Sequence, residues 1–206
     1  MAPNPNACAL ITKGRGLDCN RISGGIKNIY FGVFDTTKVT TDWTSAQIVG
    51  NTGAGTVTDI TMDGATKLFR YSLPRGTASF TDTLVGSREN GTIFYTPTIQ
   101  MMLDKLDSSM LNQMRLLGAT QTVIFAELNQ VDPVNPEHNV IVCLGAKNGM
   151  QLNAGTDASG AALGDKNGFD LTFDGLEAFP ASIVIDYTNE PFDNIDSGGA
   201  IGIISA

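Results

Sequence analysis

Charge is scarce in this sequence. Charged residues make up 17% of the 206 residues, whereas about a quarter is usual for a globular domain. The low value fits a protein whose surface is largely covered by copies of itself, and it fits an ordinary all-β protein equally well. The net charge of −8 argues against a nucleic-acid-binding surface, because such surfaces are basic.

Cysteines are few, and long apolar runs are missing. Cys8, Cys19 and Cys143 are an odd number at wide spacing, which predicts no disulfide framework. Cys143 lies in the apolar run 140–144, which is typical of a buried core residue. No run is long enough to cross a membrane, and residues 1–20 lack the basic start and apolar centre of a signal peptide. We therefore expect no membrane association, and a cytoplasmic location until the protein is assembled or released.

Residues for catalysis are scarce too. His138 is the only histidine, and its place beside a proline-rich stretch favours an exposed loop over a catalytic triad. The pairs Asp170/Asp174 and Asp193/Asp196 do not follow the calcium-loop pattern, although the sequence leaves a glycosidase-type carboxylate pair open. The glycine-rich segment 35–56 lacks the Gly-Lys-Ser/Thr of a phosphate-binding loop. No catalytic residue, metal or cofactor is predicted.

What the chain does have is a long predicted β-hairpin, from Thr77–Val85 through Asn90-Gly91 to Thr92–Leu103. Asn90-Gly91 is typical of a two-residue type I′ turn. Apolar residues recur at every second position of the returning strand, which places them on one face; they are Ile93, Tyr95, Pro97, Ile99, Met101 and Leu103. Pro97 has no N–H to donate, so an edge or a bulge is expected there.

The pattern then changes to that of a short helix over 107–117, with Asp107 before it and Gly118 after it. Its apolar stripe is Met110, Leu111, Met114 and Leu117. The other predicted elements are strands, two of them joined as a hairpin at Asp63-Gly64; they cover 26–34, 56–62, 67–73, 120–128, 139–146, 150–153, 168–179 and 181–187, with loops over 35–56 and 154–167. The apolar end Ile201–Ile204 is expected to pair with a sheet edge.

Together these elements predict a mainly β fold, a β-sandwich or half-barrel with a long hairpin and one short α-helix. We expect a single domain over 1–206, with 1–25 as a lead-in and 188–206 as a tail. Residues 1–103 carry nine basic and seven acidic side chains, and residues 104–206 carry four and fourteen. If the two halves project from opposite ends, Asp193 and Asp196 of one copy would meet basic residues near the N-terminus of the next, giving a head-to-tail stack.

Two groups of turns resemble known virion proteins. Residues 145–156 with Gly164-Asp-Lys-Asn-Gly-Phe169 resemble the close of tail-tube-like proteins of tailed bacteriophages, in which a Gly-Asp-x-Asn-Gly-aromatic turn leads into a strand. Residues 8–12, 16–19 and 24–30 resemble the start of structural proteins from phages of Bacteroidetes-type hosts. The resemblance covers roughly a third of the chain.

The resemblance implies a non-enzymatic subunit of a phage tail tube, or of a tube-like hub or connector. Such subunits form rings, usually hexameric, that stack around a channel through which DNA passes without specific binding. Their other partners are tail or neck proteins of the virion. The assembly residues expected here are Ile93, Tyr95, Ile99, Met101, Asp193 and Asp196. The alternatives are a head–tail completion or capsid decoration protein, and a β-sandwich glycoside-degrading module.

Overall fold

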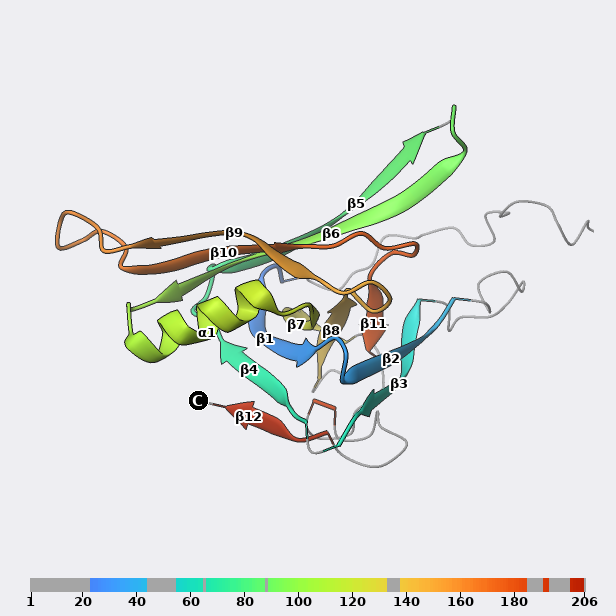
Figure 1. Ribbon diagram of the computed structural model, residues 1–206, viewed down its shortest axis with the longest axis horizontal. Coiled ribbons are helices and arrows are strands. Elements are labelled where there is room, and N and C mark those ends of the chain that lie inside the picture. The colour runs from blue at the N-terminus through green and yellow to red at the C-terminus, as the bar shows by residue number, and fades with distance from the viewer. Residues whose placement is uncertain are drawn as a thin grey trace, which may run out of the picture.

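The protein is built from two β-sheets and one helix (Figure 1). The computed structural model describes residues 23–43, 55–64, 66–87, 89–132, 138–184, 191–192 and 201–205. In this part of the chain, twelve strands and the helix α1 (Ser108–Ala119) account for the regular structure. The predicted mainly β fold with one short helix is confirmed.

The larger sheet has eight strands and curls into a half-barrel. Neighbouring strands are antiparallel except β12–β4 and β11–β3, which are parallel. Their order is β12 (Ile203–Ser205), β4 (Leu68–Ser72), β1 (Ile26–Val33), β7 (Thr122–Val131), β8 (Asn139–Leu144), β11 (Ser182–Val184), β3 (Thr56–Met62) and β2 (Thr37–Asp42).

The central strands of this sheet are buried on both faces. Ile29–Phe31 in β1 and Val123–Ala126 in β7 are consecutive residues with at most 2% of their surface exposed. One set of side chains, including Phe31 and Ile124, faces the smaller sheet, and the other, including Tyr30 and Phe125, fills the inside of the curl. Burial on both faces explains why these strands read as continuous apolar runs rather than as an alternating pattern.

The smaller sheet is antiparallel throughout. Its order is β5 (Ala78–Ser87), β6 (Thr92–Asp104), β10 (Gly168–Asp174) and β9 (Gln151–Ala158). Alternate residues of β6 and β10 face the larger sheet and form the core between the sheets; these are Ile99, Met101, Leu103, Phe169, Leu171 and Phe173. The other face of this sheet points away from the core.

The helix begins after Asp107 as predicted and ends later than predicted. Met114 and Leu117 pack against the core, but Leu111 is 49% exposed, so the buried stripe is narrower than the sequence suggested. Gly118 lies inside the helix, and the extended residue Thr120 follows the last turn. The prediction that Gly118 ends the helix is therefore wrong: Gly118 packs beside Leu152 and does not take a left-handed conformation.

The predicted hairpin between 56–62 and 67–73 is also wrong. β3 pairs with β2 and β11, whereas β4 pairs with β1 and β12 near the other edge of the half-barrel. Asp63-Gly64 does bend the chain, with Gly64 at φ 69°, but a turn signal does not determine which strand becomes the partner. Leu68 of β4 is buried in the same cluster as Val57 and Ile60 of β3, so the two strands share a core without pairing.

Two predicted loops contain strands. β2 lies within 35–56, and β9 continues to Ala158, inside the predicted loop 154–167. Both strands are polar, and pairing with a more apolar neighbour, β3 or β10, holds them in place. Residues 44–54 lie outside the described part of the chain. The expectation for the C-terminal end is confirmed, because Ile203–Ser205 pair with the edge strand residues 68–70.

Candidate assembly surface

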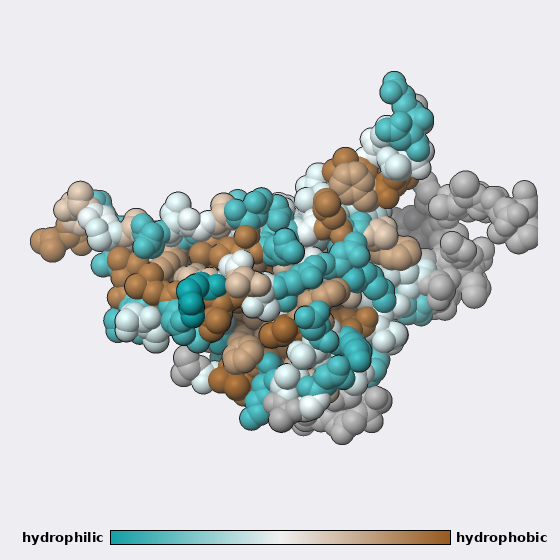
Figure 2. Space-filling model, viewed as in Figure 1, coloured by the Kyte–Doolittle hydropathy of each residue, from teal (hydrophilic) through white to brown (hydrophobic). Residues whose placement is uncertain are grey.

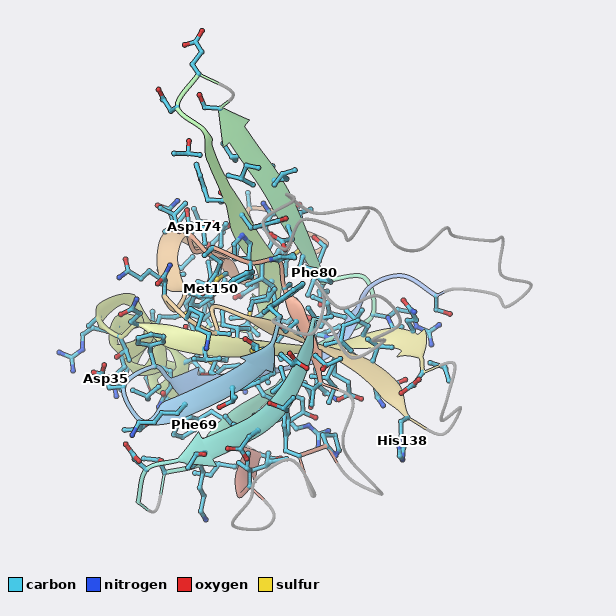
Figure 3. All side chains as sticks on the ribbon, turned by 90° about the vertical axis from the view of Figure 1, so that its right-hand side faces the viewer. Asp35, Phe69, Phe80, His138, Met150 and Asp174 are labelled. Carbon is cyan, nitrogen blue, oxygen red and sulfur yellow. The ribbon has the colours of Figure 1, made fainter. Side chains whose placement is uncertain are left out.

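The β5–β6 hairpin extends beyond the rest of its sheet. β6 pairs with β5 from Thr92 to Met101, but with β10 only from Thr98 to Asp104. Residues 83–96 therefore form a two-stranded arm, joined to the body by the backbone pair of Tyr95 and Glu177. The arm rises away from the body at one end of the long axis, with Phe80 near its base (Figures 1 and 3).

The arm exposes apolar side chains on both of its faces. Leu84 is 59% and Ile93 is 67% exposed on the face that continues the core side of the sheet. Val85 and Phe94, directly opposite each other across the hairpin, are 38% and 36% exposed on the other face. We call these four residues the arm patch. Figure 2 shows brown side chains on the arm below its hydrophilic tip.

The assembly residues expected from the sequence divide along β6. Ile93 lies on the arm patch and Tyr95 is half-buried beside it, whereas Ile99 and Met101 are 0% and 1% exposed within the subunit's own core. Asp193 and Asp196 lie outside the described residues. The alternating pattern correctly predicted that these side chains of β6 share one face. It did not show that this face is buried in the core at Ile99 and Met101 and exposed at Ile93.

The turn of the arm differs from the predicted type I′ form. Ser87 pairs with Thr92, and residues 89–91 form a turn between them. Gly91 has φ 65°, and Asn90 does not share a positive φ, whereas a type I′ turn needs positive φ at both central residues. The longer loop places the polar residues Glu89 and Asn90 at the very end of the arm.

Pro97 occupies neither an edge nor a bulge. It lies in β6, a central strand, opposite Asp82 of β5. Its carbonyl accepts a hydrogen bond from Gly175 N at 3.1 Å, just after β10 ends. A proline is tolerated here because the neighbouring strand has already left regular pairing.

Among the described strands, neither edge of the smaller sheet has a further partner. The edge strands are β5 and β9, and most of their residues are exposed. Because the sheet has four antiparallel strands, the two edge strands run in opposite directions. If a second copy were related by rotation about an axis along the strands, its β9 would lie antiparallel beside β5 of the first, the sense required for an antiparallel ladder.

The outward face of the smaller sheet is polar and free of basic residues on its strands. None of the four strands contains lysine or arginine. Three of their five aspartates, Asp104, Asp170 and Asp174, lie on this outward face, whereas Asp82 and Asp157 lie on the core side of the sheet. The rest of this face is made mainly of hydroxyl and amide side chains, such as Thr81, Thr98, Gln100, Thr156 and Thr172. Lys166, from the β9–β10 turn, forms an ion pair with Asp170.

Among the described residues, those considered for catalysis do not come together. Asp170 and Asp174 lie on the same face of β10, four residues apart, which is about 13 Å along a strand. A glycosidase pair needs about 5–9.5 Å between its carboxyl groups.

His138 precedes β8 and lies well away from Asp174 (Figure 3). Cys143 is buried, and burial raises the pKa of its thiol. Within the described ranges, no three His, Cys, Asp or Glu side chains are grouped as metal ligands.

Two buried carboxylates were not found from the sequence. Glu127 is 4% exposed and accepts hydrogen bonds from Asn28 (2.6 Å), Tyr30 (2.9 Å) and Asn139 (2.8 Å), with Lys27 at 3.1 Å. Burial opposes ionisation, but these four partners outweigh it, so the pKa of Glu127 is lowered. The sequence sign of this site was a single acidic residue, Glu127, inside the apolar run 123–128. In the structure, its hydrogen bonds connect β1, β7 and β8.

Glu177 has a local structural role. Its Oε1 accepts hydrogen bonds from the backbone N–H groups of Lys147 (3.0 Å) and Asn148 (2.9 Å). Its own backbone pairs with Tyr95 at the base of the arm, with both N···O distances at 2.8 Å. Glu177 thus links the turn after β8 to the arm, which helps to fix the direction in which the arm leaves the body.

Comparison of the chain with protein-family models, with curated proteins and with solved structures finds no match. The described helix is too short and too polar to cross a membrane.

Proposed function

We propose that the protein is a structural subunit of a phage tail tube, or of a tube-like hub or connector, and that it assembles into stacked rings around a DNA channel. The observation that carries the proposal is the smaller sheet: it has two open edges, one face in the core, one polar face without lysine or arginine, and an apolar arm beyond the body. Exposed sheet edges and apolar arms make a monomer prone to aggregation, and assembly covers both.

The directions of the strands support ring closure. A ring in which β5 joins β9 of the next copy continues one antiparallel sheet around the whole circle. Such closure pairs both edges of the smaller sheet in every copy, as closure does in a single-chain barrel. The number of subunits follows from the angle between neighbours, and the sixfold value comes from the resemblance.

The charge of the free face supports a channel lining. In this arrangement the polar face of the smaller sheet points into the ring, because its other face is already in the core. The aspartates on this face repel phosphates, and its neutral hydroxyl groups, without lysine or arginine on the strands, offer them no strong ligand. DNA therefore passes without being held.

The test is electron microscopy of the purified protein, with size-exclusion chromatography over a range of concentrations. We expect rings or tubes with a central channel. A head–tail completion or decoration protein would give discrete particles that never lengthen into tubes. A protein that remains monomeric at every concentration would contradict the proposal.

A further inference from the structure

The arm patch is left uncovered by the part of its subunit that the structure describes. Leu84 and Ile93 lie on one face, and Val85 and Phe94 on the other. An isolated two-stranded hairpin is marginally stable in water. An arm with apolar side chains on both faces is therefore expected to be held against other protein surfaces.

An apolar groove of about 230 Å³ lies between α1 and the strands β1 and β4. Phe31, Phe69 and Tyr71 form one wall, and Leu116 and Leu117 of α1 form the other. Phe69 is 43% and Leu116 is 46% exposed, so the groove is open. Ile204 of β12, opposite Phe69, is 43% exposed and extends the apolar surface.

The groove and the arm patch cannot meet within one molecule. Figure 1 shows α1 toward one end of the long axis and the tip of the arm at the other. Figure 3 shows Phe69 on the side of the body opposite the arm. Contact between them therefore joins two copies through different surfaces, and such a heterologous contact repeats from copy to copy.

The size of the arm patch argues against a closed pair joined arm to arm. Its four side chains offer on the order of 300 Å² of apolar surface, whereas each partner contributes about 800 Å² to a standard interface. A pair of arms alone would be too small for a stable dimer. The patch is sufficient as one of several contacts made by each copy in a larger assembly.

We propose that the arm patch of one copy binds in the groove between α1 and β4 of a second copy, and that this contact joins subunits head to tail. The inference rests on the proposed ring and tube function and names the surfaces that connect its subunits. Burying Ile93 against Leu116 and Phe69 covers the most exposed side chain of the arm with the most open part of the groove.

The test is a cysteine pair, Ile93→Cys with Leu116→Cys, in a chain that also carries Cys8→Ser and Cys19→Ser. Oxidation of the concentrated protein should give a ladder of disulfide-linked species of three copies and more on a non-reducing gel. The matched control is Ile93→Cys with Val131→Cys, because Val131 is as exposed as Leu116, at 47% against 46%. We expect the control to give about tenfold less ladder, because only the heterologous contact repeats.

The outcomes separate this proposal from the proposed function. Tubes without a ladder would overturn the arm–groove contact and leave the tube function standing. A monomer with no ladder would overturn both. Strong dimers from Ile93→Cys alone would show that arms pair with arms, and an equal ladder from the control would show that the arm has no specific partner; either result overturns the contact.

A charge pair gives a second measurement that does not depend on oxidation. Ile93→Lys and Leu116→Glu change exposed side chains, so each variant should fold. Each change alone should reduce the assembled fraction about tenfold, and the two together should restore much of it, because opposite charges then face each other across the contact. Failure of the double variant to recover while both single variants are fully folded would count against the contact.

Discussion

The two halves of strand β6 have the same alternating sequence pattern but differ in how much of their apolar face is exposed. Ile99 and Met101 face the larger sheet and are buried, whereas Ile93, on the same face six residues before Ile99, is 67% exposed. The alternating pattern is the same in both halves. What differs is the opposite layer: the larger sheet and α1 cover the C-terminal half of β6, whereas no described element packs over the arm. An apolar strand face thus indicates a surface that needs to be covered. The position of that part of the strand in the fold decides whether the subunit's own core covers it or, as proposed, another copy does.

The largest effect should come from the covered half. Ile99→Ala removes a fully buried side chain from the core between the sheets. We expect it to lower the free energy of unfolding by about 2–5 kcal/mol, from lost burial and the cavity left behind. Urea unfolding of the monomeric protein, followed by circular dichroism, measures it. A loss below about 1 kcal/mol would mean that the two sheets are not packed as described.

A smaller loss of stability should come from the hydrogen-bond network around the buried Glu127, which lies in the larger sheet and not in the arm. Glu127→Gln replaces an ion that four groups stabilise, so we expect a loss of about 1.5–3 kcal/mol near pH 7. Because the folded-state pKa of Glu127 is lowered, its contribution is fully present above the unfolded value of about 4.5 and is lost as pH falls below it. The unfolding midpoint, measured from pH 7 to pH 3, should therefore fall less in the variant than in the wild type.

The control for that experiment is Asp170→Asn, which removes a partly exposed ion pair with Lys166. Exposed pairs contribute about 0–1 kcal/mol, so this variant should follow the wild-type pH profile closely. Equal changes for Glu127→Gln and Asp170→Asn would indicate a general charge effect rather than the buried network.

A local effect is expected at the turn of the arm. Gly91 has φ 65°, and a Cβ added there would meet nothing within 4 Å, so Gly91→Ala adds backbone strain without a clash. We expect a cost of about 1–2 kcal/mol that falls on the arm. The hydrogen-exchange rates of the arm amides should increase, whereas the rates of the amides in β1 and β7 should not change. Quickening over the whole molecule would mean that arm and core unfold as one unit.

The smallest effect on folding should come from Ile93→Ala, the exposed counterpart of Ile99→Ala on the same strand. Surface substitutions change the free energy of unfolding by about 0.5 kcal/mol or less. Assembly should nevertheless weaken, because the side chain lies on the arm patch. Urea unfolding and size-exclusion chromatography of the same sample give the two values, and a variant that loses stability as much as Ile99→Ala would place Ile93 in the core.

The sequence by itself determined the elements with strong local signals. Alternation in 92–103 was enough for the long strand, the change of period at 107 was enough for the helix, and Asn90-Gly91 was enough for a turn between 85 and 92. These features depend on residues close together in the chain. The low charge is a property of composition, and it too could be read directly.

Only the tertiary structure decided which strands pair and which apolar faces stay open. The Asp63-Gly64 turn could not show that β3 and β4 belong near opposite edges of the half-barrel, because strand pairing depends on contacts far apart in sequence. Polar strands such as β9 form because a neighbour supplies their hydrogen bonds. Ile93 and Ile99 are indistinguishable in sequence pattern, and the larger sheet reaches only the second of them; burial is a property of the whole fold, and local sequence does not determine it.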